Sequence, residues 1–60
     1  MKLHDLDKGE QFIFNHRKYT VLRKLPRYED VYDCMDDGQR HRPFKGITDV
    51  EPLQKRIGGN

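Results

Sequence analysis

The chain has 60 residues, of which 33% are hydrophobic and 37% are charged, and its formal net charge at pH 7 is +2. A chain of this length forms one domain at most and hides only about 60% of the surface that its unfolded form exposes, which argues against a deep catalytic cleft. The single cysteine, Cys34, excludes an internal disulfide and favours a reducing, cytoplasmic location. No apolar run is long enough for a signal peptide or a membrane span, so neither secretion nor membrane insertion is expected.

Charged residues form blocks of alternating sign along the chain. A basic block at 16–28 is followed by an acidic block at 29–37 and by a second basic block at 38–46. The small net charge therefore permits an anionic partner without requiring one.

The first hairpin is predicted from apolar and polar residues that alternate in the first third of the chain. A two-residue turn at 16–17 would place Phe14 opposite Tyr19. Phe12 would then lie opposite Val21, and all four side chains would share one face as a core seam. A four-residue loop would place the same four side chains on one face.

The second hairpin is predicted at Asp37-Gly38, because glycine accepts a positive φ at no steric cost. A two-residue loop there places Asp33 opposite Arg42, whereas a bulged three-residue loop places Asp33 opposite His41. The sequence leaves both registers open, and it leaves open which face of residues 31–35 is buried. Both registers put the acidic strand beside the basic one.

Three more features complete the predicted fold. A loop at 26–30 joins the second and third strands, and a last short strand at 49–53 lies at an edge, where proline is tolerated. Leu3 and Leu6 are expected to cover one open end of the sheet. Five short strands in so short a chain favour a small, highly curved barrel of the SH3 or OB type, because curling removes exposed edges.

Three segments carry a resemblance to a known fold family: LHDLDKGEQFIF at 3–14, KYTVLRKL at 18–25 and the DG pair at 37–38. The leucine-rich lead, with a glycine three residues before an aromatic residue, resembles small SH3-like barrel domains, and KOW-type modules of transcription and translation proteins are broadly similar. The compact, charge-rich make-up is also similar to small phage-encoded proteins that bind host machinery. We predict an all-β domain at 1–53, a five-stranded SH3-like barrel, with a flexible tail at 54–60.

Basic residues interleaved with aromatic residues support one functional hypothesis, a small RNA- or DNA-binding barrel. Cations along a groove contact phosphates, and aromatic faces stack on bases. The candidate residues are Arg17, Lys18, Arg23, Lys24, Arg40 and Arg42. The competing interpretation is that acids of the third strand pair with the flanking basic strands and cancel the field that would attract phosphate. The sequence favours this internal pairing for the segment 40–42.

Candidate metal ligands and catalytic residues are few. His4, Asp5 and Asp7 lie close together, but no second ligand pair follows at a zinc or calcium spacing, so no metal or cofactor is expected. Cys34 and His41 face each other in one hairpin register, as a nucleophile and its base would. A lone cysteine on a strand is more typical of a small buried apolar residue, and the chain has no serine and no glycine-rich phosphate loop. We therefore expect no enzyme activity.

The preferred hypothesis is a non-enzymatic interaction module that binds and regulates a protein partner, in the manner of a phage-type regulator of host machinery. The chain has more aromatic residues than one face of a thin sheet can bury, and tyrosine with arginine is typical of interface hot spots. The predicted contact residues are Tyr28, Tyr32, Arg40, Arg42 and Phe44. A folding or assembly module of a larger complex is a third hypothesis, and self-association would support so thin a core.

Overall fold

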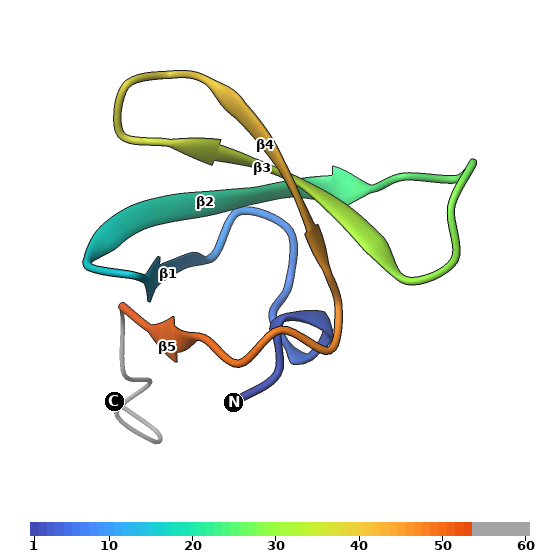
Figure 1. Ribbon diagram of the computed structural model, residues 1–60, viewed down its shortest axis with the longest axis horizontal. Coiled ribbons are helices and arrows are strands. Elements are labelled where there is room, and N and C mark those ends of the chain that lie inside the picture. The colour runs from blue at the N-terminus through green and yellow to red at the C-terminus, as the bar shows by residue number, and fades with distance from the viewer. Residues whose placement is uncertain (54–60) are drawn as a thin grey trace.

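The computed structural model of the protein describes residues 1–53 as one curved, antiparallel, five-stranded sheet (Figure 1). In chain order the elements are the 3-10 helix η1 (Leu3–Asp5) and the strands β1 (Gln11–Phe14), β2 (Arg17–Lys24), β3 (Val31–Asp36), β4 (His41–Lys45) and β5 (Glu51–Pro52). The strand order is β4-β3-β2-β1-β5, so the chain runs as a meander and then returns to pair β5 with β1. The predicted five-stranded all-β fold is confirmed, and it is compatible with an SH3-like barrel. The predicted tail at 54–60 lies outside the described residues.

The β1–β2 hairpin turns at Asn15 and His16, whose φ angles are 53° and 67°. Phe14 therefore lies opposite Arg17 rather than Tyr19, and the predicted register is wrong by two residues. The reason is that asparagine and histidine enter the left-handed region more readily than most residues, and a primed two-residue turn needs that region at both positions. The predicted face of the side chains is nevertheless correct. Side chains along a strand alternate with a period of two, so a register shift of two residues leaves each of them on the same face.

The β3–β4 loop spans residues 37–39 and is closed by the Asp36 N–H, which donates to the Arg40 carbonyl at 2.9 Å. Gln39 adopts the left-handed conformation, with φ 64°, that a three-residue hairpin loop requires. The Asp36 side chain accepts hydrogen bonds from the Gly38 and Arg40 N–H groups, each at 2.9 Å. These local bonds stabilise a loop that neither predicted register contained.

The register between β3 and β4 therefore differs from both predictions. Asp33 lies opposite Pro43, and Cys34 lies opposite Arg42. The Asp33 carboxylate still contacts the diagonal neighbour His41, with 3.1 Å between Oδ2 and Nδ1. The acidic strand β3 does lie between basic strands, as the sequence indicated.

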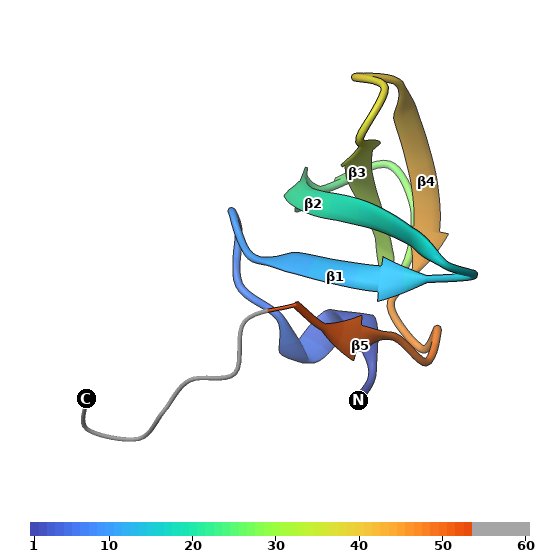
Figure 2. The ribbon, with the colours of Figure 1, turned by 90° about the vertical axis from the view of Figure 1, so that its left-hand side faces the viewer.

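The core occupies one face of the curved sheet, and the lead-in segment with η1 lies beside β5 (Figure 2). Its buried apolar residues are Leu3, Leu6, Phe12, Tyr19, Val21, Cys34 and Val50. Tyr32 and Phe44 are partly buried against this cluster, so β3 turns Tyr32 and Cys34 inward. Within residues 1–53, no helix is long and apolar enough to cross a membrane.

Candidate interaction surface

Both tight hairpin turns, β1–β2 and β3–β4, lie at the same end of the sheet, as Figure 1 shows. We define the hairpin-end surface as five residues that extend from the core face of the sheet to this end: Phe14, Arg17, Arg40, Arg42 and Phe44. Arg17 is the cross-strand partner of Phe14. Arg40, Arg42 and Phe44 occupy alternate positions and therefore share one face of the chain.

The aromatic part of this surface is an outward extension of the core. Phe44 makes edge contacts with the rings of Phe12, Phe14 and Tyr19, at centroid distances of 5.6, 5.3 and 4.9 Å. Phe12 stacks on Tyr19 at 5.4 Å. Phe14 is the outermost ring of the cluster and is 36% exposed. Phe14 therefore packs on the aromatic core through Phe44, while part of its side chain stays open to solvent.

Asp36 lies beneath the arginines of this surface. Its side chain is only 4% exposed, and its Oδ2 atom is 4.0 Å from Nε of Arg42. The pKa of Asp36 is lowered, chiefly by the hydrogen bond from the Arg40 N–H, with further contributions from the Gly38 N–H and from the charges of Arg42 and Arg40. Burial opposes this shift but does not reverse it. Asp36 therefore stays ionised and ties the loop to β4.

Internal pairing takes up few of the basic side chains. His41 pairs with Asp33, Arg42 is 4.0 Å from Asp36, and Lys2 pairs with Asp49 at 3.2 Å. Within residues 1–53, eight lysine and arginine side chains form no ion pair with a carboxylate of this part of the chain: Lys8, Arg17, Lys18, Arg23, Lys24, Arg27, Arg40 and Lys45. The internal pairing expected for the segment 40–42 is thus present at two of its three residues.

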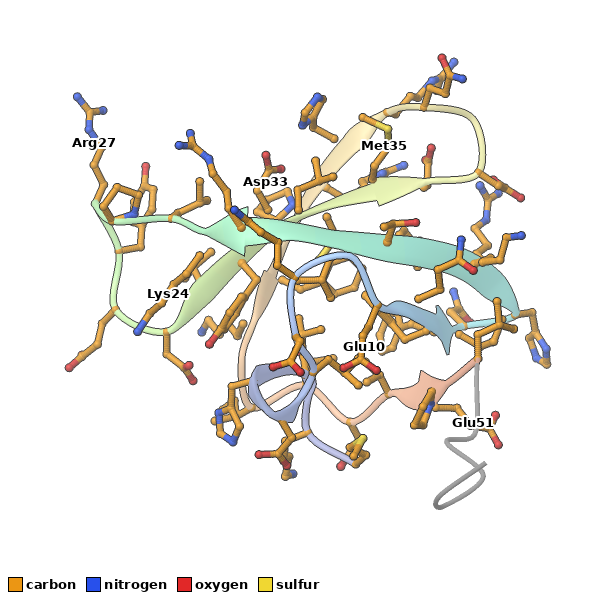
Figure 3. The ribbon with its side chains drawn as sticks, turned by 180° about the vertical axis from the view of Figure 1, so that it is seen from behind. Glu10, Lys24, Arg27, Asp33, Met35 and Glu51 are labelled. Atoms are coloured by element: carbon orange, nitrogen blue, oxygen red, sulfur yellow. The ribbon has the colours of Figure 1, made fainter. Side chains whose placement is uncertain are left out.

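The six residues of the nucleic-acid hypothesis do not form one stripe. Arg17, Arg40 and Arg42 lie at the hairpin end, whereas Arg23 and Lys24 lie at the opposite end of β2. Figure 3 shows Lys24 together with Arg27 at the end of the molecule away from the β3–β4 loop. Lys18, the remaining member, is paired with Ile13 on the face away from the core.

The predicted protein-binding residues are brought together in part. Tyr32 and Phe44 are direct cross-strand partners, and Arg42 and Arg40 continue along the same face of the chain. Tyr28 is 58% exposed in the β2–β3 loop, at the other end of the sheet from Arg40. The sequence interpretation places Phe14 in the core and not among the protein-binding residues. The exposure of Phe14 depends on the path of β4, and no local sequence pattern indicates that path.

The cysteine and histidine that could have formed a catalytic pair lie on different faces. Cys34 is fully buried, and its pKa is raised to about 12, mainly by burial and also by the negative charge of Asp33. His41 contacts Asp33 on the outer face of the sheet. A thiol that is buried and protonated is a poor nucleophile.

His4 contacts two aspartates and has a structural role. Its Nδ1 atom lies 3.5 Å from Asp30 Oδ2, and its Nε2 atom lies 3.8 Å from Asp5 Oδ1, so His4 links η1 to the β2–β3 loop. Across residues 1–53, no group of three or more histidine, cysteine, aspartate and glutamate side chains could hold a metal ion.

Each edge strand carries a proline whose backbone nitrogen points toward the free edge of the sheet. The Asp36 N–H donates to the Arg40 carbonyl, which marks these two residues as a hydrogen-bonding position of the β3–β4 ladder. Such positions alternate along an antiparallel ladder, so Pro43 occupies a non-hydrogen-bonded position with its nitrogen toward the free edge of β4. The bond from the Leu53 N–H to the Gln11 carbonyl gives Pro52 the same position in β5. Proline offers no N–H there, so neither edge presents a complete template for an added strand.

Comparison with known proteins found no matching family model, no matching curated protein and no matching solved structure.

Proposed function

We propose that the protein is a non-enzymatic interaction module that docks on a protein partner through the hairpin-end surface and regulates that partner. The observation that carries the proposal is the combination of a core-packed, partly exposed Phe14 with the guanidinium groups of Arg17, Arg40 and Arg42. Phenylalanine and arginine are both enriched at the cores of protein interfaces, and arginine is also enriched among hot-spot residues.

The aromatic geometry favours a protein over a single-stranded nucleic acid. Base stacking needs a row of free ring faces, but Phe44 already contacts three rings. The two most exposed aromatic side chains, Phe14 and Tyr28, lie at opposite ends of the sheet. The cations of the predicted nucleic-acid set are divided in the same way, so within residues 1–53 they form no continuous stripe of charge beside the rings.

The two edge prolines favour recognition by side chains over recognition by strand addition. A peptide that adds to a sheet edge uses the backbone N–H and C=O groups of that edge. Pro43 and Pro52 interrupt those groups in β4 and β5. The hairpin-end surface does not need a free strand edge.

A capture experiment with matched variants examines this proposal. We expect Phe14→Ala and Arg42→Ala each to lower the affinity for the partner by about tenfold or more, as hot-spot truncations do. Lys45→Ala is the control, because Lys45 is exposed on β4 but on the opposite face from Arg42. Quantitative mass spectrometry of the captured proteins should show a set that wild type and Lys45→Ala retain and the other two lose. If folded variants all capture the same set, the surface is not the docking site.

Several expectations from the sequence accompany this proposal without supporting it. A cytoplasmic location, a KOW-type relationship and a phage-type role in regulating host machinery remain predictions. Nucleic-acid binding is the alternative function, and the eight lysine and arginine side chains without an ion pair in residues 1–53 are the observation in its favour. It predicts binding that falls steeply with salt, because each neutralised phosphate releases counterions.

A further inference from the structure

We propose that the hairpin-end surface binds an acidic segment of its protein partner, with carboxylates on the arginines and an apolar side chain beside Phe14. This inference rests on the proposed function and names the chemistry of the partner that the surface would select.

The arginines have hydrogen-bonding capacity that the fold does not use. Each guanidinium group carries five N–H donors, and its planar fork matches the two oxygens of a carboxylate. Arg42 has one long contact, 4.0 Å, to Asp36, and its side chain remains 55% exposed. Arg17 and Arg40 have no carboxylate partner among residues 1–53. Three guanidinium groups of the hairpin-end surface are therefore available to bind carboxylates.

The nearby acids do not cancel this charge. Asp36 is buried below the surface, and one of its oxygens is occupied by two backbone N–H groups. Asp37 is exposed in the adjacent loop and is the one solvent-facing acid of that hairpin turn. Arg17, Arg40 and Arg42 thus outnumber the two carboxylates at the β3–β4 turn, Asp36 and Asp37, and this excess positive charge would steer an acidic segment to the arginines.

Phe14 supplies the apolar half of the site. Its ring contacts Phe44 at a centroid distance of 5.3 Å with an interplanar angle of 83°, and Phe44 in turn packs against the buried core. An aromatic or branched apolar side chain of the partner can cover Phe14 while neighbouring carboxylates reach Arg17 and Arg42. This arrangement gives an apolar contact surrounded by charge-assisted hydrogen bonds.

Selection from a random linear peptide library on the immobilised full chain examines the inference. We expect enriched peptides to carry aspartate or glutamate next to an aromatic or branched apolar residue. For a selected peptide, Arg17→Glu should lower the affinity by about tenfold or more, and amide replacement of the peptide's acids should do the same. Arg42→Glu is the second variant, with its folding checked because Arg42 also faces Asp36. Lys45→Glu, on the opposite face of β4, should change the affinity by less than about twofold.

The outcomes separate this inference from the proposed function. Enriched peptides without acids, whose binding still requires Phe14, would overturn the acidic partner and leave the docking surface standing. Absence of any enriched peptide would contradict both. Binding of a short oligothymidylate that falls steeply with salt, with no peptide selected, would replace both with the nucleic-acid alternative.

Discussion

Asp36 is the residue that determines the shape of the β3–β4 hairpin, because its carboxylate holds two loop N–H groups and faces Arg42. Asp36→Ala removes these acceptors and should lower the melting temperature by several degrees. Asp36→Asn keeps one acceptor oxygen and should cost less. Thermal unfolding followed by circular dichroism distinguishes the two variants. Equal melting temperatures for wild type and Asp36→Ala would contradict this role.

The lowered pKa of Asp36 also predicts how stability depends on pH. A carboxyl group whose pKa is lower when folded contributes stability above its unfolded pKa, and that contribution is lost as the pH falls through the folded value. Wild type should therefore lose more stability than Asp36→Asn as the pH falls below about 4, the ordinary range of an aspartate pKa. Parallel pH profiles for the two proteins would show that the charge of Asp36 does not matter.

Cys34 should be chemically inert in the folded protein, because it is buried and its pKa is about 12. At about pH 8 the native thiol should react with a disulfide reagent at least about 100-fold more slowly than the thiol of the urea-unfolded chain. A spectrophotometric thiol assay measures both rates. Similar rates would show that Cys34 is accessible and that the core is open around it.

At the scale of elements, the β1–β2 turn carries a conformational cost that one substitution should remove. His16 has φ 67°, a conformation that costs a residue with a side chain about 1 kcal/mol more than glycine. His16→Gly should therefore raise the free energy of unfolding by about 1 kcal/mol, and His16→Val should lower it by a similar amount. Chemical denaturation tests the pair, and the reverse order would mean that the turn has a different conformation.

The edges of the sheet lead to a prediction about association. Pro43→Thr restores an N–H at the free edge of β4, so the variant should self-associate more than wild type as concentration rises. Pro26→Thr, in the β2–β3 loop, is the matched control. Sedimentation velocity compares the three proteins. Identical sedimentation of all three at every concentration would show that Pro43 does not protect the edge.

At the scale of the whole molecule, period-two patterning was sufficient to predict the five strands and the burial of Phe12, Tyr19 and Val21. It was not sufficient for either hairpin register. Left-handed positions fell on His16 and Gln39 rather than on glycine, and side-chain preferences alone do not specify such positions.

The candidate surface was harder to predict than the strands. Arg40, Arg42 and Phe44 were identified from residue type, and they do share one face. Tyr28 was grouped with them, but the β2–β3 loop carries it to the other end of the sheet. Phe14 was missed, because its exposure depends on the three-dimensional path of β4 and not on any nearby residue.

An amide-resolved NMR titration, first with a selected acidic peptide and then with a short oligothymidylate, would show whether the hairpin-end surface binds acidic protein segments. We expect the peptide to shift the amide signals of Phe14, Gly38 and Arg40, since the last two donate to Asp36 beneath the surface. We expect no comparable response to the oligonucleotide. Shifts caused by the oligonucleotide at both ends of β2, around Arg17 and Lys24, that fade at physiological salt would contradict binding of an acidic protein segment as the function of this surface.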